Sequence, residues 1–318
     1  MRDSRYGVTR RRVSFELRED RVENLLMAIA SGPIILPLDG SKNAENALPW
    51  AAALATAYAR DVEFIHVVDH EGARNGEQLR KAEGTFASHA AELASEWGIA
   101  GHRATILQGA PAAKILGAAA GASFITIASH GHGGFRATFL GSVADKVVRG
   151  ATVPIVLVPG VGGPALPGPQ PVLVGVDGSE AAEQALRLGR EVAQKLGAPV
   201  ALMRAWAIPP LATASFYPSY IDSQLVDSLR IAAEEYVASV AQPGEQTFVA
   251  QGLPAVAIAE AAGQINAGLV VVASSGKGLA ARIALGSTTD RLMHSLHRPL
   301  LIVPVTDQAS PAPGTRGA

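Results

Sequence analysis

The most constraining feature of the sequence is a glycine-rich stretch that occurs twice, at 128–142 and 273–287. In both copies a glycine is followed by nine residues and then by Gly-Ser. Each copy comes after an apolar, strand-like run and before a segment with helical spacing. A glycine-rich loop between a strand and a helix turns its backbone N–H groups toward an anion and ends on the positive helix terminus. Two such loops in the same setting therefore predict two anion sites.

The rest of the chain repeats in the same order. The repeated features are an apolar strand ending in Asp-Gly-Ser, a Gly-x-Pro step before a helix, and a proline-flanked last strand, at 33–41 and 171–179, 109–111 and 252–254, and 154–159 and 299–304. The copies are 138 residues apart at the aspartates and 145 apart at the loop glycines. This small drift fits a few inserted residues in loops, so the pattern indicates a tandem duplication.

Composition sets the boundaries of the repeated units. Residues 1–30 carry seven Arg and five acids and form an N-terminal extension, either a frayed end or a docking arm for a partner. Glycine and proline mark 160–170 as a linker. The sequence thus predicts domains at 31–159 and 171–305, followed by a flexible tail at 306–318. The second domain also contains a proline- and aromatic-containing insert at 207–221, which is a lid, a partner contact or a plain loop.

Strands and helices alternate along each unit. In the first unit we expect strands at 33–38, 62–68, 102–107, 124–128 and 154–159, with helices at about 44–58, 79–97, 112–120 and 142–149. Ser41 is a plausible N-cap of the first helix. Pro49 lies inside that helical pattern and predicts a kink or a later helix start. The alternation predicts an α/β fold with a parallel, doubly wound sheet and right-handed crossovers.

Composition also bounds the class of protein. At 318 residues with 48% hydrophobic and 5% aromatic content, the chain has an ordinary α/β composition. A formal net charge of −1 gives no electrostatic case for nucleic acid or an anionic membrane. The chain has no cysteine, which excludes disulfides and thiolate chemistry. No apolar run approaches the roughly 20 residues of a membrane span, and we expect a cytoplasmic protein.

The doubly wound sheet places the repeated motifs together. Ligands of such sheets bind beyond the carboxyl ends of the strands, where the strand order reverses. If the first and fourth strands of each unit flank that reversal, Asp39 faces the loop at 128–142, and Asp177 faces the loop at 273–287. A carboxylate opposite a nest of backbone N–H groups suits a nucleotide, with the carboxylate at the ribose hydroxyls and the glycines at the phosphates.

Taken together, these motifs resemble those of the universal stress protein family, in tandem form and of the branch that binds ATP. The likeness covers 33–159 and 171–305 and includes a His-Val step on the second strand. It implies five-stranded sheets of order 3-2-1-4-5. In this family the last strands, here 154–158 and 299–303, lie at the sheet edge, and an uncovered edge invites pairing. We therefore expect the halves to pack as a pseudo-twofold dimer and chains to self-associate through these strands.

The resemblance implies specific site residues. In the first half Asp39 would hold the ribose or a phosphate-bound ion, and the backbone of Val67 would read the adenine edge. The ribose and phosphate path would be formed by Ala128, Ser129, Gly131, Gly141, Ser142 and Val143. The matching residues of the second half are Asp177, Ala205, Ala273, Ser274, Gly276, Gly286, Ser287 and Thr288. The implied cofactor is ATP, with Mg²⁺ or Mn²⁺ reaching the two aspartates through the nucleotide.

The sequence departs from the family pattern at two places. Ala128 and Ala273 stand where the family loop usually has another glycine, and alanine restricts positive φ and close backbone approach. In the second half Arg204-Ala205 replaces the His-Val step, which weakens the implied adenine contact.

Structural alternatives exist for several of these residues. The two aspartates could be turn residues without a ligand. Ser142 and Ser287 are each followed three residues later by an aspartate, which is a capping-box pattern. His130 and His132 would form a poor metal pair, because no Asp, Glu or Cys lies near them in sequence, and they do not match a nucleotidyltransferase box. His66 fits a satisfied core histidine, and Lys277 either contacts phosphate or is an exposed loop residue.

Three functions remain open on this basis. The first is an ATP-binding stress or signalling protein with little chemistry, acting on an unknown client protein. The second is a nucleotide-free dimerising scaffold of the same fold. The third is a slow ATPase or nucleotidyl transferase, which the missing Walker lysine and the lack of an evident general base or nucleophile disfavour. We expect the first, and no enzyme.

Overall fold

The fold is that of a computed structural model, which describes residues 31–68, 76–129, 140–160, 167–208, 223–275 and 285–305. The N-terminal extension, most of the 207–221 insert and the C-terminal tail lie outside the described residues. So do Gly131, Gly276, His130, His132 and Lys277.

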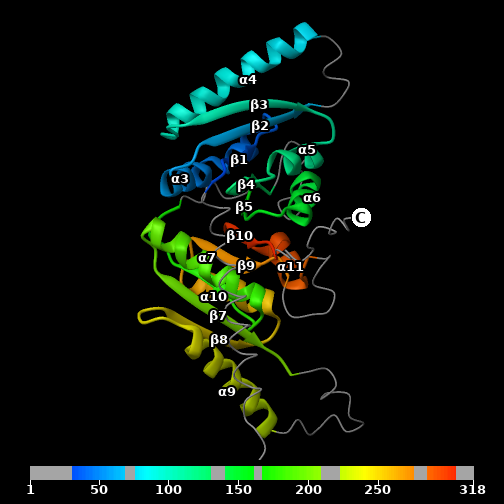
Figure 1. Ribbon diagram of the computed structural model, residues 1–318. Coiled ribbons are helices and arrows are strands. Elements are labelled where there is room, and N and C mark those ends of the chain that lie inside the picture. The colour runs from blue at the N-terminus through cyan, green and yellow to red at the C-terminus, as the bar shows by residue number, and fades with distance from the viewer. Residues whose placement is uncertain are drawn as a thin grey trace, which may run out of the picture.

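The strands form one ten-stranded sheet of order β3-β2-β1-β4-β5-β10-β9-β6-β7-β8 (Figure 1). Each half therefore has the order 3-2-1-4-5 that the sequence predicts. The strands are β1 (Ile34–Pro37), β2 (Val62–Val68), β3 (His102–Gln108), β4 (Phe124–Ala128), β5 (Ile155–Val158), β6 (Val172–Gly175), β7 (Val200–Trp206), β8 (Gln246–Gln251), β9 (Leu269–Ala273) and β10 (Leu300–Val303). Strands within each half are parallel, as expected for a doubly wound fold.

Helices cover both faces of this sheet. The described helices are α2 (Lys42–Glu45), α3 (Leu48–Tyr58), α4 (Gly76–Glu96), α5 (Pro111–Ala118), α6 (Ser142–Gly150), α7 (Glu180–Leu196), α9 (Ser223–Val240), α10 (Pro254–Gln264) and α11 (Ser287–Ser295). Buried residues of α3, α4, α7 and α9 share one core cluster with the sheet. Those of α5, α6, α10 and α11 share a second cluster on the other face. The core is built mostly from aliphatic side chains, and Trp50, Phe64 and Phe124 are its largest fully buried members.

The proline inside the first helical pattern delays a helix start. A short helix, α2, follows the N-cap Ser41, whose hydroxyl accepts from the backbone N–H of Ala44 at 3.2 Å. The main helix α3 then begins at Leu48, which puts Pro49 in its first turn. Proline is tolerated there because no intrahelical partner is lost. The later helix start predicted from Pro49 is thus confirmed.

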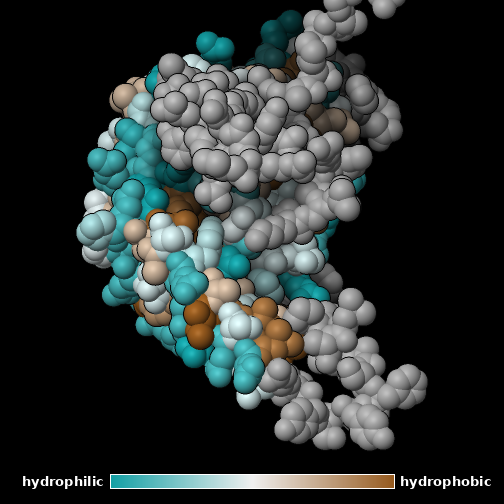
Figure 2. All heavy atoms as spheres, turned by 60° about the horizontal axis from the view of Figure 1, so that its bottom comes forward, coloured by the Kyte–Doolittle hydropathy of each residue, from teal (hydrophilic) through white to brown (hydrophobic). Residues whose placement is uncertain are grey.

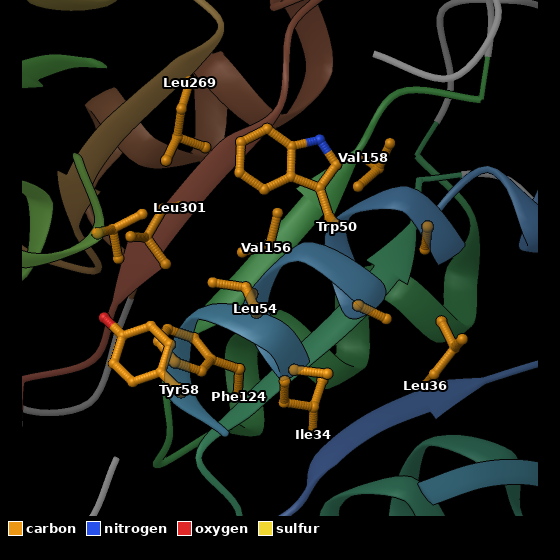
Figure 3. Packing of buried hydrophobic residues seen from close by; sticks show 14 of the residues in the cluster. Ile34, Leu36, Trp50, Leu54, Tyr58, Phe124, Val156, Val158, Leu269 and Leu301 are labelled. Carbon is orange, nitrogen blue, oxygen red and sulfur yellow. The ribbon is translucent and has the colours of Figure 1, made fainter. Parts of the chain in front are cut away.

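The two halves join through their last strands, β5 and β10, which we call the joint. These strands pair antiparallel, with Leu301 opposite Val156. Both are buried, at 0% and 1% exposure, and belong to a core cluster that contains residues of both halves. Figure 3 shows Trp50 of α3 near the side chains of both joint strands. The expected intramolecular pseudo-dimer is confirmed, and the two strand edges cover each other within one chain.

Polar contacts also cross the joint. The guanidinium of Arg149, at the end of α6, pairs with Asp145 one turn earlier and with Asp290 in the first turn of α11. On the other face of the sheet, the Lys195 ammonium of α7 donates to the Ala57 carbonyl at 3.1 Å. The same ammonium lies 4.7 Å from the ring centroid of Tyr58. Each half therefore donates a hydrogen bond to an acceptor of the other half.

The visible surface carries few large apolar side chains. Figure 2 shows hydrophobic residues as small separate patches within a hydrophilic face. Exposed large apolar residues of the described chain include Leu225, Ile231, Leu253, Val256 and Val305. Within the described ranges, no helix has the length and apolar character needed to traverse a bilayer.

Candidate functional site

Strand register brings the repeated motifs together at the carboxyl ends of adjacent strands. In the first half β1 pairs with β4, with Ile35 opposite Ile125. Four residues further along each segment, Asp39 is therefore level with Ser129. In the second half β6 pairs with β9, with Val174 opposite Val271. Three residues further along each segment, Asp177 is level with Ser274. The reversal of strand order lies between these strands in both halves, so each aspartate stands at a crevice where α/β proteins bind ligands.

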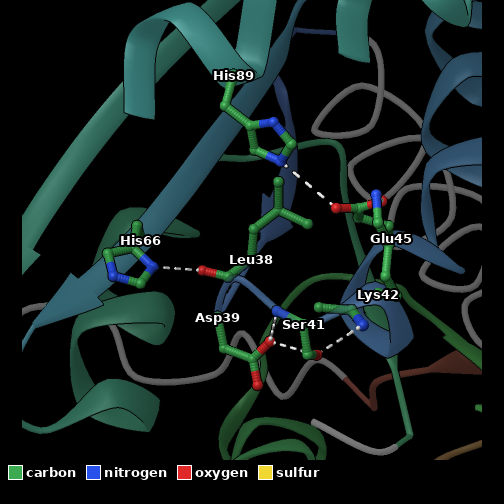
Figure 4. Close-up of polar contacts among 8 residues, drawn as sticks. Leu38, Asp39, Ser41, Lys42, Glu45, His66 and His89 are labelled. Atoms are coloured by element: carbon green, nitrogen blue, oxygen red, sulfur yellow. Dashed lines mark hydrogen bonds and ion pairs between the residues drawn. The ribbon is translucent and has the colours of Figure 1, made fainter. Parts of the chain in front are cut away.

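The Asp-Gly-Ser turn fixes the position of each aspartate. The Asp39 Oδ1 atom accepts from the backbone N–H of Ser41 at 3.0 Å and from its hydroxyl at 2.6 Å (Figure 4). Gly40 has φ 82°, a left-handed conformation that favours glycine. The turn role expected as the alternative for Asp39 is therefore present. It holds the carboxylate in a defined place at the strand end.

The second half builds the same turn. The Asp177 Oδ1 atom accepts from the backbone N–H of Ser179 at 2.8 Å, and Gly178 has φ 78°. The Ser179 hydroxyl caps α7 by accepting from Ala182 N–H at 3.1 Å. The helices that follow the aspartates thus have side-chain caps of their own.

The helices that follow the glycine loops begin differently. Their N-caps are Gly141 and Gly286, and among the described residues neither α6 nor α11 has a side-chain cap hydrogen bond. The capping-box interpretation of Ser142 and Ser287 is therefore wrong, because both serines lie inside the helix at its first position. A glycine cap leaves first-turn N–H groups without a side-chain acceptor, and a helix terminus of this kind suits an anion.

Ser129 and Ser274 fasten each loop at its base. The Ser129 carbonyl accepts from Gly141 N–H at 2.7 Å, and its buried hydroxyl accepts from Gly160 N–H at 3.1 Å. The Ser274 carbonyl accepts from Gly286 N–H at 2.8 Å, and its hydroxyl accepts from Val305 N–H at 3.1 Å. The start and end of each loop therefore meet beside the aspartate. The carbonyl and hydroxyl oxygens of both serines thus accept hydrogen bonds within the chain. This structural role was not predicted from the sequence.

The second strand of each half presents backbone groups to the same crevice. The ladder between β1 and β2 ends at Pro37 and Ile65, followed by a bond from Leu38 N–H to the Ile65 carbonyl at 2.8 Å. Backbone groups that face one neighbour alternate along a strand, so the N–H and C=O of Val67 point to the same side as those of Ile65. β1 has ended at that level. The backbone of Val67 therefore faces the space beside Asp39.

Ala205 occupies the same position in the second half. Val176 N–H donates to the Met203 carbonyl at 2.9 Å, and Ala205 lies two residues further along β7. Because only backbone groups are presented, the replacement of His-Val by Arg204-Ala205 leaves this arrangement unchanged.

The alanines that depart from the family pattern lie in regular strands. Ala128 ends β4 and Ala273 ends β9, at 6% and 9% exposure. The residues other than glycine with positive φ in the described chain are Ala59 and Asn266. Neither Ala128 nor Ala273 is strained, so the conformational concern raised by alanine at these positions does not apply.

Other predicted residues have clear environments. Val143 packs against the core cluster of its own face, on the second residue of α6, and Thr288 is the second residue of α11. His66 is half-buried and its Nδ1 atom lies 2.8 Å from the Leu38 carbonyl, so one ring nitrogen is paired, but the residue lines a pocket and is not part of the buried core. Within the described ranges, no group of three or more potential metal-ligating side chains was found. Any ion at Asp39 or Asp177 would need oxygens from elsewhere, such as a nucleotide.

The fold defines a class of protein, a tandem α/β protein in which each half places the repeated motifs at a reversal of strand order. The chain belongs to the universal stress protein family, whose model matches residues 31–159 and 169–304. A universal stress protein of Mycolicibacterium smegmatis is 25% identical over 298 residues, covering 85% of this chain and 96% of that protein. One from Thermus aquaticus is 36% identical over 132 residues, covering 39% of this chain and 96% of its own length.

Solved structures agree with the fold. A universal stress protein from Archaeoglobus fulgidus superposes with a TM-score of 0.63 at 22% identity, covering 86% of this chain and 98% of that one. A universal stress protein structure from Pseudomonas aeruginosa gives the same TM-score at 15% identity and covers 87% and 95%. These relatives match both halves, so the tandem arrangement is shared.

Proposed function

We propose that this universal stress protein binds two adenine nucleotides, one in each half, and acts as a stress-response or signalling protein with little catalysis of its own. The observation that carries the proposal is the glycine-capped start of α6 and α11 beside a fixed aspartate. Phosphate oxygens would bind the first-turn N–H groups at Gly141 and Gly286. The ribose would lie at the aspartates, and the base edge at the backbone of the second strand.

ATP fits this arrangement better than a nucleoside alone. The loop after each fourth strand spans nine residues between its two glycines, which provides several further N–H donors for a phosphate chain. Mg²⁺ or Mn²⁺ would bridge phosphate oxygens and the carboxylate of Asp39 or Asp177. We further propose that the protein acts in the cytoplasm on a client protein and that its chains associate with one another.

The first test is the content of the purified protein. Acid release followed by chromatography should yield adenine nucleotide at up to two per chain. Calorimetric titration with ATP, with and without Mg²⁺ or Mn²⁺, should then show two binding events on the emptied protein. We expect the first-half event to be the tighter one.

Single substitutions separate the two sites. Gly131→Glu should remove the tighter event and Gly276→Glu the weaker one, because a carboxylate and its bulk would stand where phosphate binds. We expect a loss of about two to three decades in affinity, or about 3–4 kcal/mol. Gly84→Glu is the matched control, since a Cβ at this exposed α4 position meets nothing within 4 Å. A double variant that binds ATP like the wild type would refute the site assignment.

A nucleotide-free scaffold is the second candidate. The observation that favours it is that Asp39, Asp177, Ser129 and Ser274 all make internal hydrogen bonds, so their presence does not require a ligand. Protein that contains no nucleotide as purified and shows no binding heat with ATP and metal would establish this alternative.

A further inference from the structure

A cavity of about 470 Å³ lies in the first half between α4 and the carboxyl ends of β1, β2 and β3. Its walls are largely apolar, and they include Leu38, Val68, Phe86 and Ile106. This volume lies within the range of about 300–1,000 Å³ that is typical of small-molecule pockets. The cavity is therefore large enough for a ligand of two or three rings.

This cavity is separate from the proposed nucleotide site. Leu38 and Phe86 pack in the core cluster on the α3 and α4 face of the sheet, whereas Val67 packs in the cluster on the opposite face. None of the residues proposed to bind nucleotide lines the cavity. The two sites meet at the Asp-Gly-Ser turn, because Gly40 and Ser41 line the cavity directly after Asp39.

The ring of His66, which lines the cavity, carries one hydrogen-bond acceptor. A carbonyl can only accept, so the 2.8 Å contact between His66 Nδ1 and the Leu38 carbonyl requires the proton on Nδ1 (Figure 4). In the neutral imidazole, Nε2 is then an acceptor. The His66 ring also packs against Phe86, with centroids 5.5 Å apart at an angle of 42°. The site thus offers an aromatic wall and one acceptor.

The rim of the cavity has a charge arrangement of its own. Glu45 is paired with Lys42 at 2.8 Å and lies 3.4 Å from the Nε2 atom of His89. The Glu45 carboxylate therefore has basic groups beside it, and Lys81 also lines the cavity. An apolar body with a single polar group fits these walls better than a charged molecule.

The second half has different side chains at the equivalent positions. Arg204 stands where the first half has His66, and its guanidinium lies 4.5 Å from the ring centroid of Tyr236 on α9. Burial raises the pKa of Tyr236, and the nearby carboxylate of Glu183 raises it further. Glu183 corresponds to Glu45, which lines the cavity in the first half.

We propose that the first-half cavity binds a small, neutral aromatic molecule carrying one hydroxyl or N–H group. Its rings lie against Phe86, and its hydroxyl or N–H donates to Nε2 of His66. The Asp-Gly-Ser turn, which contributes to both sites, gives such a ligand a direct structural connection to the nucleotide crevice.

The test uses 2-naphthol as the probe in calorimetric titration of the full chain. We expect saturable binding of one molecule per chain. Ala82→Trp should weaken it at least tenfold, because Ala82 lines the cavity and a larger side chain fills it. Ala87→Trp, at an exposed position of the same helix that does not line the cavity, should change it less than twofold. Absence of saturable binding, or equal binding in the two tryptophan variants, would overturn the proposal.

Two further comparisons test the acceptor and the separateness of the site. Wild type should prefer 2-naphthol over 2-methoxynaphthalene, which has no donor, and His66→Phe should abolish that preference. Gly131→Glu should leave 2-naphthol binding unchanged. A preference that persists in His66→Phe would refute the role of Nε2. Loss of the probe in Gly131→Glu would place it in the nucleotide crevice instead. Failure of ATP binding alone leaves these results unaffected, so the two proposals are tested independently.

Discussion

Replacing Leu301 by alanine should weaken the association of the two halves. Leu301 is fully buried and lies opposite Val156 of the partner half. A buried Leu→Ala change costs about 2–5 kcal/mol. Since 1.4 kcal/mol corresponds to a factor of ten, the dissociation constant of the halves would rise roughly 30- to 4,000-fold if the whole cost fell on their association. Leu301 also contacts its own half, so only part of this cost falls on the association, and we expect a rise of at least about tenfold.

The assay needs halves that are separate chains but folded together. A protease site placed in the linker at 160–170 would be cleaved after purification, and sedimentation would be followed over a concentration series. The cleaved wild type should remain associated. The cleaved Leu301→Ala protein should dissociate at concentrations where the wild type does not.

Leu202→Ala is the matched control for this experiment. Leu202 is equally buried and belongs to the same core cluster, but it lies on β7, away from the joint. It should lower the free energy of unfolding by a similar amount without changing the association. The reasoning fails if the cleaved wild type separates readily, or if both leucine variants have the same dissociation constant.

Three further outcomes are expected. Burial raises the pKa of Glu245, but the Arg190 guanidinium bound to both its oxygens brings the pKa below the usual value. In urea unfolding at pH 7, Glu245→Gln should lower the free energy of unfolding by about 1.5–3 kcal/mol. The difference between the wild type and Glu245→Gln should shrink below about pH 4.5. Burial raises the pKa of Glu191, so the folded protein binds this proton more tightly than the unfolded chain. The free energy of unfolding should therefore fall as pH rises above about 4.5. Glu191→Gln should make the free energy of unfolding less dependent on pH in that range. Single-turnover assays should show little hydrolysis of labelled ATP over hours, and robust turnover that Asp39→Ala or Asp177→Ala abolishes would contradict a binding role.

Much of the fold could be predicted from the sequence because it depends on local patterns. The apolar runs, the proline at position 49 and the repeated turns each act within a few residues. The strand order followed from a resemblance carried by several motifs at once. The bare last strands, with buried side chains from Ile155 to Val158 and from Leu300 to Val303, indicated the joint because an unpaired apolar edge is unfavourable in water.

The details of the candidate site were harder to predict. Ser142 with Asp145 has the spacing of a capping box, but whether serine or the preceding glycine is the cap depends on how the chain enters the helix. The fastening roles of Ser129 and Ser274 depend on the last strands, which lie far away in sequence. The first-half cavity depends on the spacing between α4 and the sheet, which no local pattern specifies.

The covalent link between the halves removes a constraint that separate identical subunits must obey. In a symmetric homodimer every substitution at the interface appears twice, near the axis often facing its own copy. Here Lys195 occupies the position that corresponds to Ala57, and its ammonium donates to the Ala57 carbonyl; in a homodimer two lysines would meet. Arg149 likewise corresponds to His294, so its bridge to Asp290 is made once. The covalent link thus lets the two halves carry different residues at equivalent positions of the joint.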